Sequence, residues 1–311
     1  MKKRIKQKAR GLLESFVSSA LKVPAMAGAR NIDPYVSSLL SSLPDKEGLN
    51  DPGFFVALLR ESFMPYRSKV KEIKRTAVEG DPSELRFSRL IETLESAIPP
   101  LRAPLALEMA SIADAYLGNT EYREEWGADV AWHFRISSSF PKKGRLLDSI
   151  VRFMRPVCCV EAGTAYGMSA LFVLSALEKY CQDGTLYTVE AFDPQYSLSS
   201  KLLTSRFDTT VRCYRGLTAD TLNTVVTEAG NIDLFVHDAG HSRDDYVNDF
   251  HSVVDKLGPG SIVLFDDIRW DDPRFCETPP RCYAGWREVA SHPRVCQAVE
   301  VGSNMGMLRL C

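Results

Sequence analysis

The stretch VCCVEAGTAYGMSA, residues 157–170, decides how this chain folds. An apolar run of strand length leads into Glu161 and then into two closely spaced glycines, Gly163 and Gly167. Leucines at helical spacing follow from residue 171, so the stretch predicts a strand, a tight turn and a helix. Because small residues let a backbone approach a ligand closely, the turn is a candidate binding site. Glu161 argues against a phosphate and favours a ligand with ammonium or hydroxyl donors.

Strands and helices alternate downstream of this turn. Strand-like runs end at Glu190, Tyr214, Asp238 and Asp267, and helical patterns separate them. Such alternation is typical of a parallel sheet that helices cover on both faces. The pattern of residues 295–310 predicts a β-hairpin. We therefore expect an α/β fold: a doubly wound, Rossmann-like sheet of seven strands that ends in an antiparallel C-terminal hairpin.

The sequence of residues 1–135 predicts helices and no strands. One helix start is marked by Asp81–Glu84, in which an acidic residue, a proline and a glutamate occupy the positions of a capping box. We expect an all-helical region over residues 1–135 and a sheet-containing domain over residues 136–311. The sequence leaves three roles open for the helical region: a lid, a homodimer interface, or packing support.

The composition describes an ordinary globular protein. Hydrophobic residues make up 45% of the 311 positions, charged residues make up 25%, and the formal net charge is −2. This charge balance predicts no nucleic-acid partner. The basic start, Met1–Arg10, precedes apolar residues spaced along one helix face, and a docking helix is favoured over one lying on a membrane. No apolar run reaches the roughly 20 residues of a membrane span, so we expect no stable membrane insertion.

The chain has eight cysteines and no recognisable export signal. This combination indicates free thiols in a reducing compartment, and we expect a cytoplasmic protein. One group, Cys276, Cys282, His292 and Cys296, is a candidate metal site. Its spacing matches no standard zinc pattern, so scattered thiols are the favoured interpretation.

Acidic residues stand where the predicted strands end. Ligands of a doubly wound sheet bind at the carboxyl ends of its strands, near the point where the strand order reverses. Glu190 ends the second strand of the domain and is placed to accept hydrogen bonds from both hydroxyls of a ribose. Asp193 is a rival for this role, and a solvated acid is the structural alternative.

Three further carboxylates, Asp238, Asp266 and Asp267, end two strands that we expect to be neighbours. Close together and unpaired, they would repel one another. A divalent cation relieves this repulsion, and carboxylate oxygens with water suit Mg²⁺, with Mn²⁺ or Ca²⁺ as alternatives. Without a cation, one acid would be protonated or would pair with Arg269.

His241 lies three residues beyond Asp238, in the turn before a predicted helix. A neutral imidazole there would accept a proton from a substrate hydroxyl near neutral pH. His241 and Asp238 are therefore the candidate catalytic residues. The structural alternative is a histidine that only caps the helix or holds the loop.

Four stretches of the chain, taken in order, resemble the successive motifs of class I S-adenosylmethionine-dependent methyltransferases: EAGTAYGMS at 161–169, YTVE at 187–190, DLFVHDAGH at 233–241 and GPGSIVLFDD at 258–267. Within that class they look most like the cation-dependent O-methyltransferases, both the catechol and caffeoyl-CoA type and the branch that acts on sugars and antibiotic precursors. The resemblance covers residues from about 135 to the end of the chain.

This resemblance implies roles for individual residues. The expected S-adenosylmethionine-binding residues are Glu161, Gly163, Tyr166, Gly167, Ser169, Glu190 and Asp238, and the expected Mg²⁺ ligands are Asp238, Asp266 and Asp267. His241 stands where catechol-type enzymes carry a catalytic lysine, and Asp267 stands where they carry asparagine. Both departures favour the natural-product branch. Arg269, Trp270 and Trp286 are candidates for the wall of the acceptor pocket, with the core as the equal alternative for the tryptophans.

The resulting expectation is a Mg²⁺-dependent O-methyltransferase that methylates a hydroxyl of a small molecule, a natural product or a sugar. Two alternatives compete with it. One is a metal-independent N- or O-methyltransferase in which His241 acts as base. The other is an inactive, methyltransferase-like interaction protein, which would not bind S-adenosylmethionine.

Overall fold

The computed structural model describes residues 32–43, 49–76, 81–120, 134, 141–207, 210–269, 281–302 and 304–311. The chain divides into two compact units. One unit comprises residues 1–64 and 100–134, and the other comprises residues 65–99 and 135–311. The second unit is therefore assembled from two separate stretches of sequence.

The first unit is helical where it is described. Its helices are α2 (Ile32–Leu40), α3 (Pro52–Phe63) and α5 (Ala103–Leu117). Asp51 starts α3, because its side chain accepts a hydrogen bond from the backbone N–H of Phe54 at 3.0 Å. Asn50 also donates to the carboxylate of Asp114 at 2.9 Å, which ties the start of α3 to α5.

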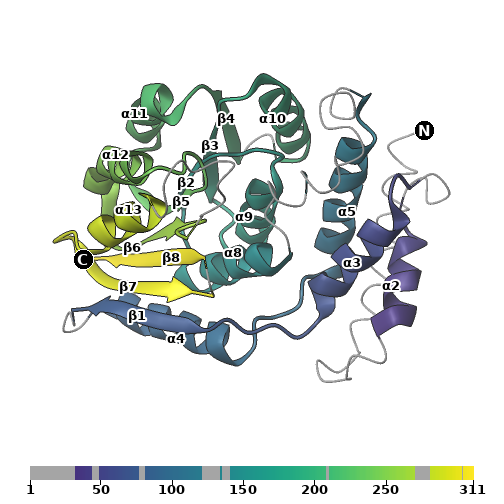
Figure 1. Cartoon of the computed structure of the whole chain (residues 1–311), viewed down its shortest axis with the longest axis horizontal. Helices are drawn as coiled ribbons and strands as arrows, with labels where there is room; N and C mark the ends of the chain where they lie inside the picture. Colours follow the sequence, from purple (N-terminus) through teal and green to yellow (C-terminus); the bar gives the residue numbers. More distant parts are fainter. Residues whose placement is uncertain are drawn as a thin grey trace. The chain divides into compact units, whose positions relative to one another are not determined.

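The second unit holds one sheet with strand order β1-β7-β8-β6-β5-β2-β3-β4. Strands β2 to β6 run parallel, while β8, β7 and β1 add to the sheet in antiparallel pairs (Figure 1). The strands are β1 (Val70–Arg75), β2 (Cys158–Ala162), β3 (Thr185–Glu190), β4 (Val211–Arg215), β5 (Ile232–His237), β6 (Leu257–Phe265), β7 (Val295–Val301) and β8 (Met305–Leu310). The order reverses between β2 and β5, so the predicted doubly wound fold with an antiparallel C-terminal hairpin is confirmed.

Helices cover both faces of this sheet (Figure 1). They are α4 (Pro82–Ser96), α8 (Pro141–Met154), α9 (Met168–Tyr180), α10 (Asp193–Phe207), α11 (Thr218–Ala229), α12 (Arg243–Val253), a short 3₁₀ turn (Val254–Lys256) and α13 (Arg281–Ala290). On one face, Phe235 and Phe265 of the strands form a core with Phe250 of α12 and Trp286 of α13. On the other face, α8 packs against both α9 and α4.

The prediction of an all-helical region before residue 136, and of seven strands, was wrong in one respect. Val70–Arg75 forms strand β1, which pairs with β7 and brings the sheet to eight strands. Its sequence, VKEIKR, lacks alternation because β1 lies at the sheet edge, where exposed charged side chains are common. The expected boundary at residue 135 also differs from the structure, since residues 65–99 belong to the unit that holds the sheet.

The expectation of free thiols was wrong for one pair. Cys296 and Cys311 form a disulfide with their Cα atoms 5.2 Å apart. The β7–β8 register pairs Val295 with Leu310 and so brings the two neighbouring cysteines together, although they are far apart in sequence. The remaining described cysteines are free: Cys158, Cys159, Cys181, Cys213 and Cys282. Among the described helices, none has the length and apolar character needed to cross a membrane.

Candidate active site

The glycine turn follows β2 and lies against the end of β5. Gly163 has φ +92°, and a Cβ at this position would lie 2.0 Å from the carbonyl oxygen of Asp238. Only glycine combines this dihedral angle with this close approach. Gly167 has φ +80° and forms the N-cap of α9. The turn therefore holds the ends of two neighbouring strands in close contact at the switch point of the sheet.

Glu161 is buried beneath this turn. Its Oε2 accepts a hydrogen bond from Oγ1 of Thr188 at 2.5 Å, and the hydroxyl of Ser169 also hydrogen bonds to the carboxylate. Among the described residues, none hydrogen bonds to its Oε1. Burial raises the pKa of Glu161 to about 7, although both hydroxyl groups act to lower it. Ser169, expected at the methionine end of the cofactor, thus contacts Glu161.

Glu190 ends β3 and supports the glycine turn. Its Oε2 accepts from the backbone N–H of Ala165 at 2.6 Å, and its Oε1 accepts from that of Phe192 at 2.8 Å. Burial raises the pKa of Glu190, and the backbone hydrogen bonds act in the opposite direction. Each carboxylate oxygen retains a second lone pair for a ribose hydroxyl. Tyr166 is buried within the turn. The rival residue Asp193 is exposed and forms an ion pair with Arg215.

The acids after β5 and β6 meet because the two strands are paired in register. His237 pairs with Phe265, and the N–H of Asp266 donates to the carbonyl of His237 at 2.9 Å. Nε2 of His241 lies 3.3 Å from Oδ2 of Asp267. Ligand atoms of Asp238, His241 and Asp267 lie within 4.8 Å of one another. The predicted gathering of these residues at one sheet edge is therefore observed.

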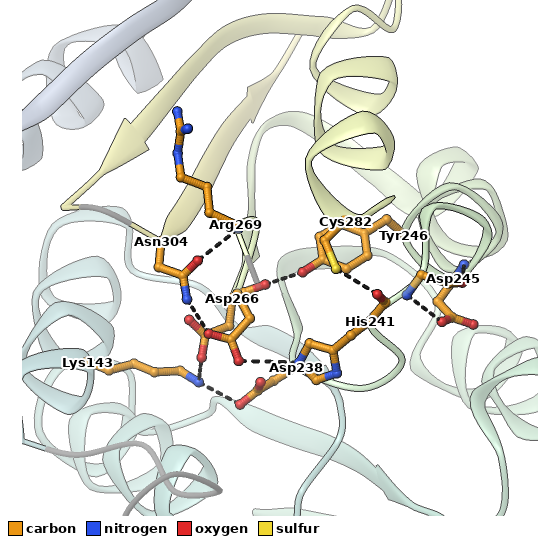
Figure 2. A network of polar contacts seen from close by, with 11 residues as sticks. Lys143, Asp238, His241, Asp245, Tyr246, Asp266, Arg269, Cys282 and Asn304 are labelled. Carbon is orange, nitrogen blue, oxygen red and sulfur yellow. Dashed lines mark hydrogen bonds and ion pairs between the residues drawn. The ribbon is translucent and has the colours of Figure 1, made fainter. Parts of the chain in front are cut away.

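Lys143, from α8, joins this group and was not predicted from the sequence. Its Nζ lies 2.5 Å from Oδ2 of Asp238 and also hydrogen bonds to Asp266 (Figure 2). Burial acts to lower the pKa of Lys143, but the two carboxylates outweigh it and raise that pKa. Burial likewise raises the pKa of Asp238 to about 6, although the ammonium of Lys143 acts to lower it. A single lysine between helical residues carries no sequence signal for such a role.

A second set of residues holds the two adjacent aspartates in place. Asp267 has φ +53°, and its Oδ1 accepts a hydrogen bond from the amide of Asn304 in the β7–β8 turn. The same Asn304 accepts hydrogen bonds from the backbone of Ile268 and Arg269, both at 2.8 Å. The hydroxyl of Tyr246 donates to the carbonyl of Asp266 (Figure 2). The C-terminal hairpin therefore positions the acidic group.

The residues expected to wall an acceptor pocket have different surroundings. Trp286 is fully buried in the core, and its Nε1 donates to Glu300 at 3.4 Å. The structure thus matches the core alternative for Trp286. Arg269 donates to Glu300 at 2.7 Å and lies 4.4 Å from the centroid of the Tyr283 ring, with much of its side chain exposed. Trp270 lies outside the described residues.

The donor atoms at this site suit a divalent cation. Carboxylate oxygens are the ligands that Mg²⁺ and Mn²⁺ prefer in proteins, whereas an imidazole nitrogen suits zinc, copper, iron or nickel. The ammonium of Lys143 already places a positive charge between Asp238 and Asp266. His241 lies among the closely spaced groups with Asp238 and Asp267, and Asp266 shares Lys143 with Asp238.

Fold and site together resemble one class of enzyme domain. The glycine turn at the switch point, the acid at the end of β3 and the acids after β5 and β6 have the arrangement expected for class I S-adenosylmethionine-dependent methyltransferases. Residues 160–268 match the family Methyltransf_24, described as "Methyltransferase domain". This match confirms the resemblance drawn from the four sequence motifs.

Several individual proteins are similar to this chain. The chain is 31% identical over 137 residues to "Probable O-methyltransferase Rv1703c" from Mycobacterium tuberculosis, a match that covers 41% of this chain and 56% of that protein. It therefore spans little more than half of that relative's length. The SAH-bound methyltransferase PaMTH1 from Podospora anserina has a TM-score of 0.52 at 17% identity, covering 77% of this chain and 100% of that one. Cofactor-bound Rv0187 from MTB has a TM-score of 0.51 at 16% identity, covering 75% and 99%. These two structures support the fold.

Proposed function

We propose that this chain is an S-adenosylmethionine-dependent O-methyltransferase that methylates a hydroxyl of a small molecule. The observation that carries the proposal is the register in which β2, β5 and β6 pair at their carboxyl ends. Ala162 pairs with His237, and His237 pairs with Phe265, so the glycine turn and the acidic group are direct neighbours. A methyl donor in the turn and an acceptor at the acids would then be within reach of each other.

The glycine turn supplies the chemistry needed for the methyl donor. Gly163 lets the turn pass directly against the carbonyl group of Asp238, and Glu190 offers lone pairs to ribose hydroxyls. The buried Oε1 of Glu161 suits an ammonium or hydroxyl donor. We propose that these three residues, with Tyr166 and Gly167, bind S-adenosylmethionine.

We further propose that Asp238, Asp266 and Asp267 hold Mg²⁺ or a similar cation, with His241 beside them as the base. Such a cation lowers the pKa of an acceptor hydroxyl and helps to orient it. His241 or Asp238 would take the proton from that hydroxyl. Without a metal, burial acts to lower the pKa of His241, but the hydrogen bond to Asp267 and the nearby carboxylates raise it. A cation bound by these carboxylates would act to lower that pKa and would keep the imidazole neutral, as a base requires. A sugar or natural product as acceptor rests on the resemblance to that branch.

Lys143 favours one alternative: a methyltransferase that needs no metal. Its ammonium already neutralises part of the charge of Asp238 and Asp266, so His241 could act as base without a divalent cation. This alternative keeps the same cofactor site and the same class of reaction, on an oxygen or a nitrogen atom.

Two measurements test the proposal. Calorimetry with S-adenosylhomocysteine tests the cofactor site, and Glu190→Ala should weaken binding at least tenfold, whereas Asp193→Ala should not. Transfer of a labelled methyl group to a panel of phenols, sugars and hydroxylated natural products, with Mg²⁺ or with EDTA, tests the reaction. Absence of cofactor binding contradicts the whole proposal. Full transfer in EDTA contradicts the metal requirement and supports the alternative.

We also propose that the protein is located in the cytoplasm. The described free thiols are consistent with the expected cytoplasmic location, although the Cys296–Cys311 disulfide is not the pattern expected there. Pairing of two copies through the helical unit is the other proposal, and light scattering after size-exclusion chromatography measures it directly.

A further inference from the structure

Helix α8 is held firmly in a position that directs Lys143 toward the strand ends. A Cβ on Gly144 would lie 2.1 Å from the ring of Phe172 in α9, so only glycine permits this packing. Nε of Arg145 donates to the carbonyl of Pro99 at 2.6 Å, and its guanidinium also donates to the carbonyl of Ile98. The neighbours of Lys143 in sequence thus fix the backbone from which its side chain reaches the acids (Figure 2).

The acids Asp238, Asp266 and Asp267 interact with two different sets of side chains. Lys143 binds Asp238 and Asp266, while His241 and Asn304 bind Asp267. Asp238 belongs both to the pair of acids that holds the ammonium and to the cluster with metal-ligand spacing. A divalent cation bound to Asp238 would lie close to Nζ of Lys143, and two positive charges at such a distance repel each other.

We propose that Lys143 is an internal cation that a divalent metal ion displaces. This inference rests on the metal site of the proposed function. In the metal-free protein, the ammonium keeps the acids of the site from repelling one another. When a metal ion binds, the lysine side chain leaves Asp238, and its long flexible stem allows it to turn toward solvent. The side chain is 13% exposed and so already touches solvent. Lys143 thereby weakens metal binding, and in the metal-free protein it keeps the acids close together.

Titration of the full chain with Mn²⁺ tests this inference without any methyl transfer. Free Mn²⁺ is measured by electron paramagnetic resonance in the absence of cofactor. Lys143→Met should bind Mn²⁺ about tenfold or more tightly than the unchanged chain, because the competing charge is gone. Lys143→Arg keeps the charge and should bind no more tightly than the unchanged chain. Asp267→Asn should abolish the tight binding in the Lys143→Met background.

Lys142 offers a matched control. It lies in the same turn of α8, is exposed, and lies 5.8 Å from the centroid of the Tyr66 ring rather than at the acids. Lys142→Met removes the same charge from the chain and should leave Mn²⁺ affinity unchanged. Equal tightening by Lys142→Met and Lys143→Met would overturn the inference, because a general charge effect would explain both. Equal or weaker binding by Lys143→Met, or no binding by any variant, would also overturn it.

A second measurement uses the unchanged chain, in case Lys143→Met fails to fold. Lysine acylation followed by mass spectrometry should show that Mn²⁺ increases the labelling of Lys143 severalfold and leaves the labelling of Lys142 unchanged. Constant labelling of Lys143 at saturating Mn²⁺ would overturn the inference. Cofactor binding is measured separately by calorimetry, so failure of the cofactor site and failure of the lysine displacement are distinguishable.

Discussion

At the scale of single residues, the site depends on a glycine with a carbonyl group directly beside it. Gly163 has a positive φ, and a Cβ added to it would lie 2.0 Å from the carbonyl oxygen of Asp238. Gly230 has a similar dihedral angle, φ +75°, but its added Cβ would meet nothing within 4 Å. Comparing alanine substitutions at the two positions therefore separates the cost of backbone strain from the cost of steric overlap.

We predict that Gly163→Ala destabilises the protein by at least about 2 kcal/mol more than Gly230→Ala, which costs about 1–3 kcal/mol from strain alone. Gly163→Ala should also abolish S-adenosylhomocysteine binding, because the turn must move away from β5. Denaturant unfolding and calorimetry measure the two effects. Equal stability losses for the two variants would contradict the steric argument.

Glu161 makes stability depend on pH. Burial raises its pKa from 4.5 to about 7, so between these values the folded protein binds more protons than the unfolded chain. Its contribution to stability is therefore present below pH 4.5 and declines as the pH rises to about 7. The difference between these pKa values corresponds to about 3 kcal/mol.

We predict that Glu161→Gln flattens the decline in the free energy of unfolding between pH 4.5 and 7. The exposed Glu178, which pairs with Arg206, provides the control Glu178→Gln. Urea unfolding across this pH range measures the slopes. A profile for Glu161→Gln as steep as that of the unchanged chain would show that other groups cause the decline.

At the scale of secondary-structure elements, the contact of α8 with α9 decides where Lys143 lies. Gly144 and Phe172 form the closest part of this contact. Helix α3 contains a comparable glycine, Gly53, whose added Cβ would lie 3.4 Å from the side chain of Asp51, an ordinary contact distance. Glycine is intrinsically unfavourable in both helices, but only α8 needs it for packing.

We predict opposite effects for alanine at these two positions. Gly144→Ala should destabilise the protein by about 1–3 kcal/mol through overpacking, and it should shift Lys143 away from Asp238. Gly53→Ala should be neutral or stabilise by up to about 1 kcal/mol. Thermal and denaturant unfolding measure both variants, and Phe172→Leu should recover part of the loss in Gly144→Ala. Tolerance of Gly144→Ala without any loss would contradict the packing model.

Elements differed in how well they could be predicted. The strands that follow the glycine turn are buried, so their apolar runs and acidic ends were readable. Strand β1 was missed because its charged sequence matches an exposed edge, and pairing with β7 is what makes it a strand. The disulfide between Cys296 and Cys311 was also missed, because it depends on the register in which β7 and β8 pair.

At the scale of the whole molecule, residues 65–99 complete the unit that holds the site. Arg309 in β8 is fully buried, and it pairs with Asp81 and lies 3.8 Å from Glu84, both from the earlier stretch. Strand β1 also covers the edge of β7. A chain that begins at residue 136 would lose all of these contacts.

We predict that a fragment of residues 136–311 does not fold cooperatively and does not bind S-adenosylhomocysteine. It lacks the residues that pair with Arg309 and exposes the β7 edge to aggregation. Circular dichroism, thermal unfolding and calorimetry on the fragment and the full chain test this. Asp81→Asn in the full chain isolates the loss of the buried ion pair. A fragment as stable as the full chain would contradict the prediction.

By itself, the sequence determined the glycine turn, the order of strands and helices after it, and the residue types at the strand ends, because all of these depend on local pattern. Gly163, Glu190, Asp238 and His241 could be named from that pattern. Only the tertiary structure decided that Lys143 joins the acids and that Trp286 belongs to the core. These contacts connect residues far apart in sequence, and strand register and helix packing, which no local pattern encodes, bring them together.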